Sequence, residues 1–101
     1  MTSWSVYVVR TAEGELYTGI TTDVPRRFAQ HGAGRGAKYL RGRGPLTLAY
    51  RRVVGEHGLA LRVERRMKGL ARAEKEAVVR RRPTRARLLV LLGLDDEALR
   101  A

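Results

Sequence analysis

Two tyrosines, an arginine and a histidine in the first third of the chain have the side chains best suited to chemistry. Tyr7 lies in one apolar, β-branched stretch and Tyr17 in the next. Arg27 follows ten residues after the second tyrosine, and His31 follows four residues after that. A guanidinium binds phosphate oxygens through a planar fork. A phenol has an ordinary pKa of about 10, so it acts as a base only beside positive charge. We expect the four side chains to share one site.

Carboxylates are the next requirement, because a divalent cation prefers hard oxygen ligands. No pair or triad of acidic residues has a spacing that would hold two metal ions. If the chain uses a catalytic metal, we therefore expect one ion with Glu64 as its principal protein ligand. A surface ion pair with Lys68, four residues on, is the alternative role for this carboxylate. Cysteine is absent, and His31 and His57 are too few and too scattered for a zinc site.

A β-hairpin is the element that must position the two tyrosines. Residues 4–9 and 16–21 alternate and are rich in β-branched side chains, and a turn containing Gly14 separates them. If the loop has an odd number of residues, Tyr7 lies directly across from Tyr17 on one face of the sheet. An even number of loop residues would place the two tyrosines on opposite faces of the sheet. Simple cross-strand packing is the alternative role for such a pair.

Helices must bring in the remaining site residues. Asp23 is a good N-cap and Pro25 suits a first turn, so a helix is expected from about Val24 to about Ala33. Its four-residue spacing places Arg27 and His31 on one face and favours Arg27 over its neighbour Arg26. Further along the chain, we expect a glycine-rich loop at 32–45, a strand from Leu46 to Val54, and helices at about 57–68 and 72–80. In the tail, residues 84–101, we expect a helix through 88–92 and then a short turn capped by Asp95.

Positive charge is the strongest signal in the composition. The 101 residues carry a formal net charge of +11, which favours a polyanion such as nucleic acid over a merely solvated surface. The glycine-rich loop holds regularly spaced basic residues and an aromatic ring, which suit a phosphate clamp with a stacking platform. Gly19 would let the backbone approach a phosphate closely. The predicted nucleic-acid contacts are Gly19, Arg35, Lys38, Tyr39, Arg41 and Arg43.

A membrane or secreted location is not expected. The longest apolar run, residues 88–94, is far shorter than the roughly 20 residues of a membrane span. The first residues lack the pattern of a signal peptide. We expect a cytoplasmic protein that is a monomer or a weak homodimer.

Taken in order, the motifs resemble the GIY-YIG nuclease domain, most of all its small stand-alone, single-domain branch. The matching pieces are Val-Tyr-Val at 6–8, Tyr-Thr-Gly at 17–19, Arg27, His31, Gly-Ala-Lys-Tyr at 36–39 and Ala-Leu-Arg-Val-Glu at 60–64. They cover about residues 4 to 80. The resemblance implies an α+β fold, in which helices flank a three-stranded antiparallel sheet. We expect this domain to occupy residues 1–82 and a C-terminal helical extension, 83–101, to pack on it.

The resemblance also implies roles for individual residues and one divalent metal ion, Mg²⁺ or Mn²⁺. Tyr7 would orient or deprotonate the attacking water, with Tyr17 supporting it and contacting phosphate; Arg27 would bind the scissile phosphate, His31 would assist proton transfer, and Glu64 would hold the metal. Ile20 replaces a lysine common in the family, and the chain contains no asparagine. These departures bear on turnover and metal affinity more than on fold.

Three functions fit these observations. The first is a metal-dependent endonuclease acting on DNA rather than RNA, including branched or damaged DNA in repair, with little sequence specificity because no separate reading module is present. The second is a catalytically weak or inactive nucleic-acid-binding module of the same fold. The third is a basic interaction protein that docks onto an acidic protein partner.

Overall fold

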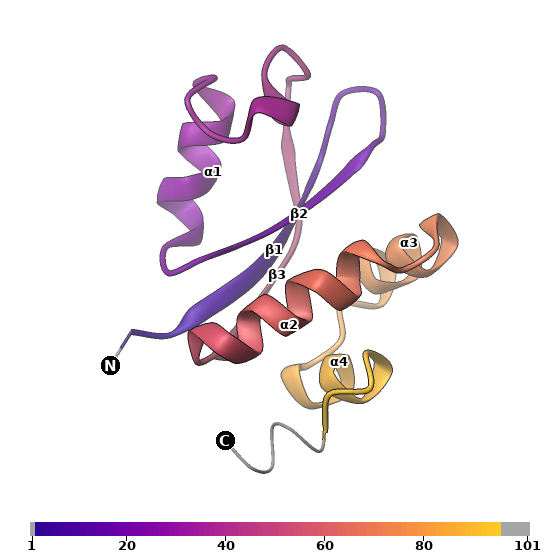
Figure 1. Ribbon diagram of the computed structural model, residues 1–101. Coiled ribbons are helices and arrows are strands. Elements are labelled where there is room, and N and C mark those ends of the chain that lie inside the picture. The colour runs from indigo at the N-terminus through magenta and orange to yellow at the C-terminus, as the bar shows by residue number, and fades with distance from the viewer. Residues whose placement is uncertain (1, 96–101) are drawn as a thin grey trace.

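A three-stranded antiparallel sheet carries the helices of this protein (Figure 1). The computed structural model describes residues 2–95. Its elements are β1 (Trp4–Arg10), β2 (Leu16–Thr21), α1 (Val24–Gly32), the short 3₁₀ helix η1 (Lys38–Leu40), β3 (Thr47–Gly55), α2 (His57–Lys68), α3 (Arg72–Arg81) and α4 (Arg85–Leu91). The strand order is β2-β1-β3, so β1 is central. This arrangement confirms the α+β fold predicted from the sequence.

The register of the hairpin puts both tyrosines on one face, but not directly opposite each other. Tyr7 pairs with Gly19, and Tyr17 pairs with Val9. The expectation of a direct Tyr7–Tyr17 pair was wrong by two residues. The turn is the reason: the amide of Gly14, at φ +93°, donates to the carbonyl of Thr11, so the turn lies further along the chain. The tyrosines are diagonal neighbours within reach of each other.

The two faces of the sheet bury separate apolar clusters. Val6 and Val8 of β1 face a cluster completed by α2, α3 and the C-terminal segment. Tyr7 and Val9 face a smaller cluster with Val24 of α1. Because successive side chains of a strand point to opposite faces, the central strand contributes to both. The smaller cluster is the one that contains the candidate site.

Helix α1 begins as its local signals predict. The Asp23 side chain accepts a hydrogen bond from the amide of Arg26 at 3.1 Å, and Pro25 lies in the first turn. Val24 and His31 are the buried residues of this helix. The helix therefore presents an imidazole, and not only apolar side chains, to the core beside Tyr7.

The C-terminal segment packs on the same domain as the sheet. Leu88 and Leu89 of α4 are buried in the larger cluster. The Tyr50 hydroxyl and the Arg52 Nε both donate to the Pro83 carbonyl, at 2.8 and 3.0 Å, and fix the link between α3 and α4 to β3. The short turn expected after Asp95 lies outside the described residues. Within residues 2–95, no helix is long and apolar enough to span a bilayer.

Candidate active site

Tyr7 lies at the centre of the candidate site. Its side chain is almost fully buried and passes across Gly19 on the neighbouring strand. A Cβ atom at position 19 would stand 2.5 Å from the Tyr7 hydroxyl oxygen, so glycine is needed there to make room for the phenol. Gly19 is itself buried. Gly19 therefore makes room for Tyr7, and its contact with nucleic acid stays a prediction.

A hydrogen bond joins Tyr7 to His31 of α1. The Tyr7 hydroxyl lies 2.7 Å from His31 Nε2, and the amide of Ala37 donates to His31 Nδ1 at 3.0 Å. Because Nδ1 accepts a hydrogen bond, it has no proton, and the ring proton is on Nε2. His31 therefore donates to the Tyr7 oxygen. Burial and the nearby charge of Arg27 lower the pKa of His31, which keeps this ring neutral.

The glycine-rich loop, predicted at 32–45, spans residues 33–46 in the structure, and its backbone holds the imidazole in place. A Cβ atom at Gly36 would overlap His31 Nδ1 and lie 2.9 Å from its Cα. Only glycine lets the loop approach closely enough for the Ala37 amide to reach the ring. Sequence reasoning missed the part played by Gly36, although it recorded the loop as unusually rich in glycine.

Arg27 and Glu64 also act on the Tyr7 phenol. Burial and the neighbouring Tyr17 raise the pKa of Tyr7, and the charge of Glu64 raises it further. Hydrogen bonding and charge from Arg27 lower the pKa. The pKa of Tyr7 that results is about 12. Arg27 also donates to Gln30 Oε1 at 3.0 Å. The phenol is therefore protonated in the free protein, and further positive charge is needed to ionise it.

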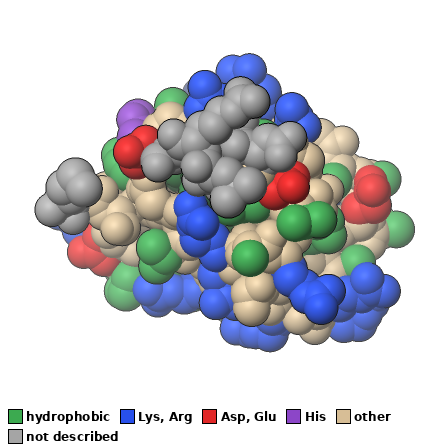
Figure 2. All heavy atoms as spheres, turned by 90° about the horizontal axis from the view of Figure 1, so that it is seen from below, with side chains coloured by type: hydrophobic (Ala, Val, Ile, Leu, Met, Phe, Trp, Pro, Cys, Tyr) green, Lys and Arg blue, Asp and Glu red, His purple; other side chains and the backbone are tan. Residues whose placement is uncertain are grey.

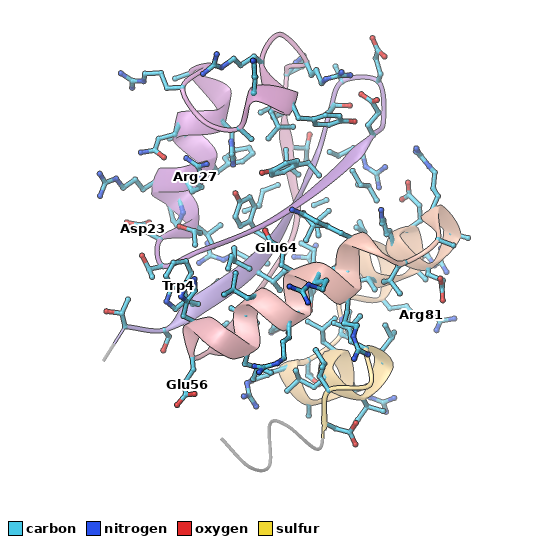
Figure 3. All side chains as sticks on the ribbon, viewed as in Figure 1. Trp4, Asp23, Arg27, Glu56, Glu64 and Arg81 are labelled. Atoms are coloured by element: carbon cyan, nitrogen blue, oxygen red, sulfur yellow. The ribbon has the colours of Figure 1, made fainter. Side chains whose placement is uncertain are left out.

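Glu64 reaches the site from the other side of the sheet. It lies on α2, between this helix and the strands in Figure 3, and its side chain is 22% exposed. Lys68 Nζ is 3.5 Å from Glu64 Oε2, so the ion pair considered from the sequence is present. In residues 2–95 no three side chains of His, Cys, Asp or Glu gather at one point. Mg²⁺ accepts one or two carboxylates with waters and phosphates. Glu64 thus fits a single ion whose other ligands are water and substrate.

Tyr17 connects His31 to the glycine-rich loop. Its ring contacts His31 edge-on, with centroids 5.6 Å apart, and stacks beside Tyr39 at 6.0 Å. The Tyr7 phenol is bonded by His31, and its pKa is influenced by Tyr17, Arg27 and Glu64, so the structure brings the five predicted residues near one another. Their catalytic roles stay predictions.

Tyr39 is held in place by Glu15, a carboxylate of the hairpin turn. Its hydroxyl donates to Glu15 Oε2 at 3.1 Å, and the Arg43 guanidinium lies 4.4 Å from its ring centroid. Arg43 also pairs with Glu15 at 2.8 Å. The hydrogen bond from Tyr39 and the charge of Arg43 lower the pKa of Glu15. Arg43 thus fastens the loop to the hairpin, so its positive charge is already balanced before any phosphate is bound.

The other basic residues of the loop point to solvent. Arg35, Lys38 and Arg41 are exposed, and none has an ion-pair partner among residues 2–95. Elsewhere the positive charge is spread: on the face in Figure 2, Lys and Arg side chains form several separate groups. The loop is distinguished from these groups by its position beside the buried phenol.

A cavity of about 620 Å³ lies away from these residues. It is lined between α3 and α4 by Ala77, Val78, Arg81, Pro83, Arg87, Val90 and Leu91. It contains no carboxylate, phenol or imidazole, so it does not match the chemistry of hydrolysis.

Comparison with known families agrees with this geometry. The GIY-YIG catalytic domain model matches residues 3–77. This chain belongs to the GIY-YIG family. The match covers both tyrosines, α1, the glycine-rich loop and Glu64, and it indicates a nuclease-type fold.

The relatives of this GIY-YIG protein are small proteins of similar length. A UPF0213 protein of Klebsiella pneumoniae is 63% identical over 76 residues, which cover 75% of this chain and 72% of the relative. UPF0213 protein YhbQ of Escherichia coli O1:K1 is 54% identical over 95% of this chain and 96% of its own length. The solution NMR structure of the UPF0213 protein BH0048 from Bacillus halodurans has a TM-score of 0.51 and 43% identity, covering 76% of this chain and 82% of that one. These relatives confirm the stand-alone branch of the family.

Proposed function

We propose that this protein is a metal-dependent endonuclease that hydrolyses phosphodiester bonds in DNA, including branched or damaged DNA, with low sequence specificity. The observation that carries this proposal is the convergence on Tyr7. One buried phenol accepts a hydrogen bond from His31 while the guanidinium of Arg27 and the carboxylate of Glu64 both act on its ionisation. A purely structural tyrosine needs none of these partners.

Each residue has a role that follows from its position. Because His31 donates to the Tyr7 oxygen, the hydroxyl hydrogen of Tyr7 is left to bond a water molecule or a phosphate oxygen. Once ionised, Tyr7 accepts a proton from the attacking water. Arg27 binds the scissile phosphate and offsets the charge that develops on it. We assign His31 to stabilising the phenolate, in place of the proton transfer expected from the family, because its Nε2 already carries a proton.

Glu64 is the residue that would hold the divalent cation, Mg²⁺ or Mn²⁺. When bound, such an ion offsets charge on the phosphate and on the leaving oxygen. Lys68 pairs with the same carboxylate, so its ammonium group must leave Glu64 before a metal binds there.

A cleavage assay tests the proposal. Purified protein is incubated with Mg²⁺ or Mn²⁺ and duplex, nicked, flap and junction DNA. Arg27→Ala and Glu64→Gln should each lower the rate about 100-fold or more. The first removes the positive charge proposed to bind the phosphate, and the second removes the negative charge proposed to hold the metal ion. Arg26→Ala and Glu56→Gln are matched controls, since both side chains are exposed on the same two segments. Absence of cleavage on every DNA with either metal would refute the proposal.

The alternative is a nucleic-acid-binding module that has kept the fold without useful catalysis. This alternative is favoured by the absence, among residues 2–95, of any cluster of three metal-ligating side chains. It predicts salt-dependent binding of DNA that Glu64→Gln leaves unchanged, while replacing Arg35 and Lys38 reduces the slope of affinity against salt. Cleavage that depends on Glu64 would exclude this alternative.

A further inference from the structure

An open pocket beside the candidate active site has no part in the function proposed above. Its volume is about 330 Å³. Four elements meet around it: β2, η1, α2 and α3. The lining residues are Leu16, Tyr17, Thr18, Tyr39, Lys68 and Lys75. We call it the tyrosine–lysine pocket.

Two aromatic rings form one part of this pocket. Tyr17 and Tyr39 are stacked with an interplanar angle of 19°, and Tyr39 is 43% exposed. An exposed tyrosine is usually free to move, but Glu15 and Arg43 hold this one. The ring is thus presented to solvent in a fixed orientation. Nucleobases stack on such rings whatever their sequence.

Two lysines form the other part. The chain has three lysines among 21 basic residues, and two of the three line this pocket. Lys75 has no ion-pair partner among residues 2–95, and Lys68 is paired only with the carboxylate proposed to take the metal. A flexible ammonium group binds phosphate as a point charge. The pocket thus combines stacking surface with positive charge.

The pocket is continuous with the reacting groups. Tyr17 lines the pocket and also contacts the His31 ring that bonds Tyr7. Lys68 lies one helical turn after Glu64 and pairs with it at 3.5 Å. A ligand here would therefore lie next to the phosphate that Arg27 and Glu64 are proposed to bind.

We propose that the tyrosine–lysine pocket binds one unstacked nucleotide beside the scissile phosphate. The base lies against Tyr17 and Tyr39, and the adjoining phosphates contact Lys68 and Lys75. A base inside a continuous duplex is stacked on both sides and cannot enter, so the pocket selects single-stranded, frayed or flipped positions. This inference rests on the proposed function for its placement next to the reaction, but it concerns binding alone.

Binding without metal tests the pocket separately from catalysis. Fluorescence anisotropy in EDTA compares a short oligothymidylate, an oligomer of abasic residues with the same number of phosphates, and a duplex. The wild-type protein should bind the oligothymidylate about tenfold more tightly than the abasic oligomer, because only the former offers bases to stack. Equal binding of these two single strands would overturn the proposal.

Variants identify the residues responsible. Tyr39→Leu should lower affinity for the oligothymidylate about tenfold and affinity for the duplex less than twofold. Tyr39→Phe keeps the ring without the bond to Glu15 and should restore binding, which separates stacking from loss of loop structure. An equal loss for single strand and duplex in Tyr39→Leu would contradict the pocket.

The lysines need a control matched in charge. Lys68→Ala with Lys75→Ala should reduce the slope of log affinity against log salt for single-stranded DNA by about 1.4. Arg81→Ala with Arg87→Ala removes the same charge beside the distant cavity between α3 and α4 and should change the slope much less. Equal slopes for the two double variants would refute a specific role for the lysines. Failure of cleavage would refute the nuclease proposal alone, since all these measurements are made without turnover.

Discussion

The Tyr7 phenol combines two features that oppose each other: deep burial and a set of groups that favour its ionised form. Burial dominates in the free protein and raises the pKa of Tyr7 to about 12. At pH 8 only about one molecule in ten thousand would then carry the phenolate. Arg27 and the N–H of His31 favour ionisation, and a cation held by Glu64 would favour it further. In the proposed mechanism Tyr7 would therefore act as a base only after substrate and metal have bound.

The raised pKa of Tyr7 predicts that the rate of cleavage increases with pH. The rate in Mg²⁺ should rise about tenfold per pH unit while the pH is below the pKa of Tyr7 in the complex with metal and substrate, because the fraction of phenolate grows as the pH approaches that pKa from below. The rate should level off above that pKa. A pH–rate profile with a saturating DNA substrate measures it. Tyr7→Phe is the control and should be inactive while still binding DNA. If Tyr7→Phe still cleaves DNA and its rate rises with pH as steeply as that of the wild type, the base is not Tyr7.

At the scale of elements, the site depends on how α1 and the glycine-rich loop fit together. The contact is backbone to side chain, and Gly36 allows it. Helices α1 and α2 were predictable because their signals are local: a capping aspartate, an early proline and the spacing of apolar residues. The hairpin register depends on the turn at Thr11–Gly14 and was not. The Glu15–Tyr39 and Glu15–Arg43 contacts join residues 24 and 28 apart, which no local pattern encodes.

Gly36→Ala tests this fit. The added methyl group would overlap His31, so we expect a loss of about 1–3 kcal/mol in the free energy of unfolding and a marked loss of cleavage. Gly32→Ala is the matched control, because a Cβ atom there meets no atom within 4 Å and alanine favours a helix. Urea unfolding and the cleavage assay measure the two effects. Equal stability of the two variants would contradict the close packing of loop and imidazole.

At the scale of the whole molecule, the C-terminal segment completes the larger core. Leu88 is fully buried, while Val90 on the same helix is 63% exposed. Leu88→Ala should therefore destabilise the protein by about 2–5 kcal/mol, and Val90→Ala by less than about 0.5 kcal/mol. Thermal unfolding followed by circular dichroism measures both. Similar melting temperatures for the two variants would show that α4 does not contribute to the core.

Ion pairs that join distant elements make stability depend on pH. Arg10 of β1 binds both carboxylate oxygens of Glu76 on α3, at 2.9 and 2.7 Å, and this lowers the pKa of Glu76. The pKa of Glu15 is lowered as well. A lowered native pKa contributes stability above the unfolded value of about 4.3, and that contribution disappears as pH falls below it.

Melting temperature should accordingly fall as pH is lowered from 5 to 3. Glu76→Gln should melt at a lower temperature than the wild type at pH 6, and this difference should narrow as the pH falls towards the lowered pKa of the native Glu76 carboxylate, because protonation then removes the charge that Arg10 binds. Glu13→Gln, an exposed position in the turn, is the control and should follow the wild type. A gap that stays constant with pH would show that the Arg10–Glu76 pair does not act through ionisation.

The hydrogen bond from the Ala37 amide to His31 has a consequence for timing. The amide belongs to the same loop as Arg35, Lys38 and Tyr39, the residues predicted to meet the nucleic acid. When the loop is seated, the imidazole keeps its proton on Nε2 and offers it to Tyr7. A displaced loop would release Nδ1, and the ring could then turn or take up a second proton. In the proposed mechanism, a strand that displaced this loop would therefore weaken the hydrogen bond from His31 to Tyr7, and cleavage would depend on a loop that stays in place.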